Sequence, residues 1–264
     1  MDVRVEPLSS CDQFRAVEGL QVAVWGMPDR EVVPAHQLLA AVRTGGLVLG
    51  AFAGTVLVGF SYGFPAVRTG ARFFYSHMTG VLPEWQSRHV GFVLKCAQRT
   101  WALEQGYDRI VWTYDPLQAR NAHFNLHRLG AEASRYYVNY YGEMTDALNR
   151  GLESDRLEVD WWIAHDRVRA HLEGRTEGPP PPACPPVLET EGEEPGPVRE
   201  PQGHRVRIAI PASIRSLLER DPGLAHRWRL ATREAFQRCF AAGYAAVDFV
   251  RTDRGGWYLL EART

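Results

Sequence analysis

The spacing of hydrophobic residues along the first 145 residues alternates between two periods, which predict strands and helices in turn. Period-two alternation and β-branched or aromatic runs predict strands at residues 3–8, 47–52, 55–65, 71–82, 109–114 and 134–141. Helical spacing predicts helices that end near Trp25, Arg43, Gly106 and Gly130, with Ser9, Ser10 and Asp12 available to cap the first of them. The predicted order is β-α-α-β-β-β-α-β-α-β, which belongs to the α/β class.

The remainder of the chain has a less regular pattern. Residues 146–176 are expected to hold a connecting strand at Leu157–Ile163 and a short helix at Asp166–Leu172. Nine prolines and six glutamates between Glu177 and Gly203 predict an extended linker or surface loop that buries no core. Residues 204–264 then predict a small α+β unit with a strand, two helices and a hairpin, packed on the first domain.

Composition limits the class of protein. The chain has 264 residues, 45% of them hydrophobic, and 30 basic against 31 acidic side chains give a net charge of −1. This balance argues against a nucleic-acid or membrane partner. Four widely separated cysteines predict free thiols and no metal site, and a cytoplasmic location is expected because the N-terminus lacks a signal-peptide pattern. The uncharged stretch from Gly45 to Ala66 is long enough to span a bilayer, but its glycines favour a buried hairpin.

A strand that runs through a tight loop into a helix is the most informative segment. Such a loop presents backbone N–H groups at the positive end of the helix dipole, where a phosphate can bind. The residues Val81-x-Pro83, followed by Gln86-Ser87-Arg88-His89-Val90-Gly91, resemble the signature of the GNAT superfamily of acyl-CoA-dependent N-acetyltransferases. His89 stands where the family usually has its first glycine, so a glycine-like backbone there would carry strain. An ordinary strand-to-helix connection is the alternative.

The resemblance covers about 145 residues and implies a mixed sheet whose fourth and fifth strands splay apart. The pantetheine arm of acetyl-CoA or another acyl-CoA would lie in that gap, with its pyrophosphate on the loop. The coenzyme-binding residues that it implies are Val81, Leu82, Gln86, Ser87, Arg88, His89, Val90, Gly91, Asn121 and Asn125. Asn121 could instead cap its helix. The tyrosine that many relatives use as an acid is replaced here by Leu126.

Acyl transfer to an amine needs a base that titrates near neutrality, and His77 is the first candidate. Alternation places Tyr75 and Thr79 on the same strand face as His77. A histidine satisfied inside the sheet is the equal alternative. Asp115 is a second catalytic candidate, since it could bind the acceptor ammonium, although an Asp-Pro turn is the simpler explanation of that residue.

The sequence therefore predicts a CoA-dependent N-acyltransferase that moves an acetyl or succinyl group to the amine of a small molecule, with an apolar amino acid as the first acceptor candidate. A non-catalytic acyl-CoA-binding module is the alternative, because the usual glycine and tyrosine are both replaced. A homodimer is compatible with either.

Overall fold

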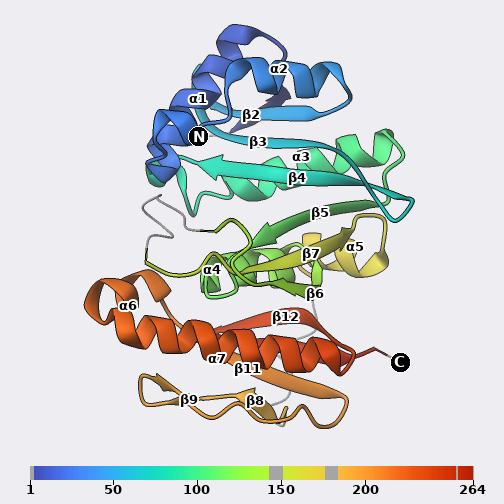
Figure 1. Ribbon diagram of the computed structural model, residues 1–264. Coiled ribbons are helices and arrows are strands. Elements are labelled where there is room, and N and C mark those ends of the chain that lie inside the picture. Colours follow the sequence, from blue (N-terminus) through green and yellow to red (C-terminus); the bar gives the residue numbers. More distant parts are fainter. Residues whose placement is uncertain (1–2, 143–150, 176–183, 254, 264) are drawn as a thin grey trace. The chain divides into compact units, whose positions relative to one another are not determined.

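The computed structural model describes residues 3–142, 151–175, 184–253 and 255–263 (Figure 1). The chain divides into two compact units. The first unit comprises the described residues up to Trp112, and the second unit comprises those from Thr113 onward. The division falls inside the strand Arg109–Tyr114. The domain boundary predicted at residue 145 lies outside the described residues.

The first unit is a mixed sheet with helices on both faces. Its elements are β1 (Arg4–Pro7), α1 (Cys11–Trp25), α2 (Ala35–Arg43), β2 (Leu47–Ala53), β3 (Val56–Arg68), β4 (Ala71–Val81), α3 (Val90–Glu104) and the first part of β5 (Arg109–Tyr114). The strands lie in the order β1 to β5, antiparallel except for the parallel pair β4 and β5. This confirms the predicted α/β mixed sheet and the expected hairpin at Gly45–Ala66. No helix in the described part of the chain has the length and apolar character to cross a membrane.

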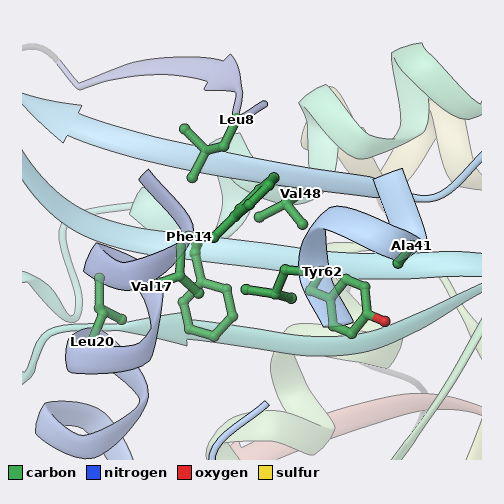
Figure 2. Packing of buried hydrophobic residues seen from close by; sticks show 9 residues of the cluster. Leu8, Phe14, Val17, Leu20, Ala41, Val48 and Tyr62 are labelled. Carbon is green, nitrogen blue, oxygen red and sulfur yellow. The ribbon is translucent and has the colours of Figure 1, made fainter. Parts of the chain in front are cut away.

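Local sequence signals explain where α1 begins and ends. The Ser10 hydroxyl accepts a hydrogen bond from the Gln13 backbone N–H, and the Gln13 side chain accepts from the Ser10 N–H, which forms a capping box. Gly26 ends the helix in the left-handed conformation. Figure 2 shows Phe14 and Val17 of this helix packed with Leu8, Val48 and Tyr62. These contacts fix α1 against one face of β2 and β3, and α3 packs on the opposite face through residues such as Val90 and Leu94.

The second unit contains the strands and helices that follow Trp112 in the described residues. Its elements are the end of β5, α4 (Ala119–Ala122), β6 (Glu132–Tyr137), β7 (Arg156–Trp162), α5 (Asp166–Leu172), β8 (Pro186–Leu188), β9 (Thr190–Glu191), β10 (Glu194–Pro195), β11 (Arg205–Pro211), α6 (Ile214–Arg220), α7 (Pro222–Ala241), β12 (Tyr244–Thr252) and β13 (Gly255–Ala262). Six of its strands are hydrogen-bonded neighbours in the order β7-β6-β12-β13-β11-β8. The helices α6 and α7 and the hairpin of β12 and β13 agree with the elements predicted for residues 204–264. Strand β12 also pairs with β6, at Ala246 and Ala133.

Two segments of the second unit differ from the sequence expectation. Within the expected linker, β8 runs parallel to β11, and its side chains Val187 and Leu188 are buried. Residues 177–183 of the expected linker lie outside the described residues. The helix expected at Ala119–Leu129 is α4 followed by a π-helical turn at His123–Arg128. Such turns insert a residue into the helical ladder and recur at functional sites.

Candidate active site

The loop between β4 and α3 has an unusual backbone. A single 3-10 turn at Pro83–Trp85 follows β4, and α3 begins at Val90. Ser87 has φ 62°, and His89 has φ 62° and ψ 5°, so both adopt the left-handed conformation. The glycine-like backbone expected at His89 is therefore confirmed, and Ser87 is a second such residue.

Left-handed backbone at a non-glycine residue costs roughly 1–2 kcal/mol, because Cβ approaches the following carbonyl oxygen. Only four described non-glycine residues have positive φ, and Ser87 and His89 are two of them. Strained conformations of this kind persist where the surrounding structure imposes them, and they cluster at ligand-binding sites. Left-handed residues alternating with other conformations also turn successive N–H groups toward one side of the chain, which forms an anion-binding concavity.

The first turn of α3 supplies further donors to this loop. The first intrahelical bond runs from the Val93 N–H to the His89 carbonyl at 3.0 Å, so the N–H groups of Val90 and Gly91 have no acceptor within the helix. The Gln86 side chain donates to the Val81 carbonyl at 3.2 Å and ties the loop to the end of β4.

Arg88 and Leu82, two of the expected coenzyme-binding residues, each make a contact within the first unit. The Arg88 guanidinium lies 5.0 Å from the ring centroid of Trp85, which holds a positive charge beside the loop. The Leu82 N–H donates to the Val58 carbonyl at 3.0 Å. Leu82 is one of the expected coenzyme-binding residues, but its N–H is already used, because hydrogen bonding to β3 continues past the end of β4.

Strands β4 and β5 pair over a short distance only. Their register joins Phe74 with Ile110 and Tyr75 with Val111. β4 continues to Val81, and no pairing with β5 is found among these described residues after Tyr75. The two strands therefore separate near the middle of β4, as the family resemblance implies.

His77 lies in a β-bulge just beyond this separation. Tyr62 of β3 pairs with Met78 and Gly63 pairs with Ser76, so His77 is the extra residue of β4. The bulge shifts the alternation by one residue. Ser76 therefore faces α3, whereas His77 projects to the opposite face of the sheet.

Three aromatic rings surround the imidazole of His77. Its ring centroid lies 5.8 Å from those of Tyr62 and Phe64 and 6.3 Å from that of Tyr75. The side chain is exposed at its outer edge, but the rings displace water from its sides, and this desolvation lowers the pKa of His77 below its usual 6.5. His77 is consequently a neutral base at pH 7. Tyr75 shares its face as predicted.

Thr79 does not share that face, contrary to the alternation argument, because the bulge at His77 reverses the phase. Its hydroxyl lies 3.0 Å from that of Ser61, and Ser61 in turn accepts a hydrogen bond from the Gln98 side chain of α3 at 3.1 Å. The buried polar network continues to Lys95, which the sequence analysis did not single out. Its ammonium donates to Ser76 Oγ at 2.7 Å and to Gln98 Oε1 at 3.3 Å.

In the second unit, Asp115 forms a buried ion pair. The guanidinium nitrogens Nη1 and Nη2 of Arg229 donate to its two carboxylate oxygens, each at 2.8 Å. Asp115 Oδ1 also accepts from the Leu117 N–H at 2.9 Å, which is the turn contact anticipated for an Asp-Pro pair. Because both oxygens are engaged, these contacts favour a structural role over binding of an acceptor ammonium.

Asn121 and Asn125, the coenzyme-binding residues expected in the second unit, differ in burial. Asn125 is buried in the π-helical turn, and its backbone carbonyl accepts from the Ala131 N–H at 3.0 Å. Asn121 is exposed inside α4, whose cap is Gln118, so it does not cap that helix. Leu126 is completely buried, as suits an apolar residue at the position of the usual tyrosine.

Comparisons with known proteins identify the fold. No family model matches the chain, and a search of curated proteins gives no match. Among solved structures, a protein of Desulfovibrio desulfuricans described as an acetyltransferase of the GNAT family is 15% identical, with 62% of this chain and 100% of that chain covered and a TM-score of 0.51. The ribosomal-protein-S18-alanine N-acetyltransferase of Escherichia coli is 14% identical, with coverages of 62% and 96% and a TM-score of 0.50. The N-terminal part of the chain therefore has the fold of GNAT acetyltransferases, which confirms the resemblance at the level of fold.

Proposed function

We propose that the protein is a CoA-dependent N-acyltransferase that transfers an acetyl or succinyl group to the amine of a small molecule. The observation that carries the proposal is the left-handed backbone of Ser87 and His89 in a loop that opens onto the N-terminus of α3. A loop that keeps this backbone without glycine fits a site for the pyrophosphate of CoA. The GNAT fold of the two solved structures named above supports the same chemistry.

The proposed acyl-CoA site lies along β4 beyond Tyr75, where pairing with β5 has ended. In that arrangement the loop from Gln86 to Gly91 holds the pyrophosphate, and Arg88 adds positive charge beside it. The acyl end would then lie near the bulge at His77. We propose a small-molecule amine as the acceptor, with an apolar amino acid as the first candidate. The aromatic rings of Tyr62 and Phe64 beside His77 suit an apolar acceptor.

His77 serves as the general base in this proposal. It is neutral at pH 7, because the surrounding rings lower its pKa, and it can accept the proton that the acceptor amine loses as its nitrogen attacks the thioester. The β-bulge supports this role of His77, because it projects the His77 side chain from the strand on the face opposite to α3.

Ligand-induced stabilisation tests coenzyme binding directly. Free CoA, acetyl-CoA and succinyl-CoA at ~100 times the dissociation constant should each add roughly 2.7 kcal/mol to the free energy of unfolding. Gly91→Val should abolish the shift, because a side chain there blocks close approach of the phosphates. Gly19→Val is the matched control, since a Cβ on Gly19 in α1 meets nothing within 4 Å. A shift that survives in folded Gly91→Val would place the coenzyme elsewhere.

Turnover distinguishes an enzyme from a module that only binds acyl-CoA. His77→Ala should lower kcat by on the order of 10²–10⁴-fold at neutral pH, keep the affinity for acyl-CoA, and recover in part at high pH as the acceptor amine deprotonates unaided. His36→Ala, at an exposed histidine of α2, should keep wild-type turnover. Equal turnover of His77→Ala and wild type at all pH values would reject His77 as the base.

A further inference from the structure

Lys95 differs from every other basic residue of the protein. It is the only lysine among 30 lysine and arginine residues, and it is also buried, with 3% of its surface exposed. In a chain that otherwise uses arginine, a lysine at a buried position indicates that the site requires a compact primary amine. A guanidinium is larger and stays charged, whereas an ammonium can lose its proton when buried.

The surroundings of the Lys95 ammonium are polar but uncharged. It donates to Ser76 Oγ at 2.7 Å and to Gln98 Oε1 at 3.3 Å, and it lies 3.9 Å from the centroid of the Trp112 indole. Ser76 and Gln98 are buried, and neither they nor Trp112 carries a charge. Within the described residues, no carboxylate forms an ion pair with Lys95. A buried cation without a counter-ion is costly, so structure alone gives little reason for it.

The position of Lys95 in the sheet suggests what the charge serves. Tyr75 and Val111 are the last paired residues of β4 and β5. Ser76 and Trp112 are the next residue of each strand, and both contact the ammonium. Lys95 therefore marks the point where the strands separate, on the face of the sheet opposite to His77.

We propose that Lys95 is a catalytic cation that stabilises the thiolate of CoA at the separation of β4 and β5. This inference rests on the proposed function, in which the acyl end lies near that point. The acceptor nitrogen bonds to the carbonyl carbon, the carbon–sulfur bond breaks, and its electron pair stays on sulfur facing Lys95. The amine proton goes to His77 and then to solvent, and solvent protonates the released thiolate.

The single lysine makes the test specific. In protein carrying ¹³C-labelled lysine, one side-chain Cε resonance reports the titration of Lys95, whose pKa burial lowers to about 7. Saturating CoA should raise that pKa by roughly 1–3 units, because a thiolate within a few ångströms favours the charged amine. Acetyl-CoA, which has no free thiol, should raise it much less. Lys95→Met confirms the assignment by losing the resonance.

A second measurement follows the thiol itself. Ultraviolet absorbance of bound CoA should show a thiol pKa lower by roughly 1–3 units in wild type than in Lys95→Met. Gln98→Met is the matched control, since it removes one acceptor of the ammonium but keeps the charge, and it should retain the lowered thiol pKa. Lys95→Met should also lower kcat by on the order of 10²-fold.

The outcomes separate the inference from the proposed function. If CoA and acetyl-CoA both stabilise the protein but the Lys95 resonance titrates alike with each, the inference is wrong and the coenzyme site stands. If neither ligand stabilises the protein, both are wrong. The resonance measurement uses wild-type protein, so it decides the matter even if Lys95→Met does not fold.

Discussion

The ion pair of Asp115 and Arg229 allows a quantitative test of the second unit. Asp115 is 8% exposed and Arg229 is 1% exposed, and two charge-assisted hydrogen bonds of 2.8 Å join them. Arg229 comes from α7 and Asp115 from the end of β5, so the pair fastens the C-terminal helix to a residue 114 positions earlier. We expect this contact to stabilise the fold and to take no part in catalysis.

Removing one partner should cost much more than removing both. Asp115→Ala leaves a buried guanidinium without its counter-ion and the Leu117 N–H without its acceptor, which should destabilise the protein by about 3–5 kcal/mol. Arg229→Met should cost a similar amount. In the double variant neither charge of the pair is left, and since apolar replacement of a buried pair is often near neutral, the total loss should be far below the sum.

A double-mutant cycle measures this coupling. Urea unfolding of the wild type, both single variants and the double variant, followed by far-UV circular dichroism, should give a coupling energy of about 2 kcal/mol or more. The exposed pair Arg215 and Glu219 on α6 is the control and should couple by about 0.3–0.5 kcal/mol. Additive losses at Asp115 and Arg229, or a folded Asp115→Ala variant of native stability without turnover, would refute the structural role.

Three further predictions concern stability. His89→Gly should stabilise the protein by about 0.5–1 kcal/mol in urea unfolding, because relief of left-handed strain exceeds the added chain entropy; a net loss would contradict the strain argument. Leu188→Ala should destabilise it by about 2–5 kcal/mol, and a loss below about 1 kcal/mol would return β8 to the expected linker. Burial lowers the pKa of Lys95 from 10.5 to about 7, so between these pH values the unfolded chain binds more protons than the folded protein. The free energy of unfolding should therefore rise with pH from roughly 7 to 10. Lys95→Met should flatten that rise.

The first unit follows closely from its sequence pattern, because each element carries its own local signal. Ser10 with Gln13 caps α1, and Gly26 ends it, so its bounds depend little on distant contacts. The bulge in β4 has no such signal. It comes from how β3 pairs beside Tyr62 and Gly63, and alternation therefore places Thr79 on the wrong face.

The second unit was harder to predict for a related reason. Proline and glutamate content argues against a buried segment on average, yet burial of β8 depends on only Val187 and Leu188 beside β11. The ion pair of Asp115 with Arg229 could likewise not be predicted from the sequence, because the two residues are 114 positions apart and no spacing rule connects them. Such long-range pairs need the tertiary structure.

Two local conflicts of the first unit, at His89 and Lys95, occur within ten residues of each other. His89 takes a backbone that favours glycine, and Lys95 buries an amine in a chain whose other 29 lysine and arginine positions are all arginine. Local violations of this kind are retained in proteins mainly where function needs them. Both belong to α3 and its cap, which the proposed mechanism places along the coenzyme from its pyrophosphate to its sulfur. A purely structural helix would explain neither residue, whereas a helix that binds a phosphate at its first turn and faces a thiolate at its second explains both.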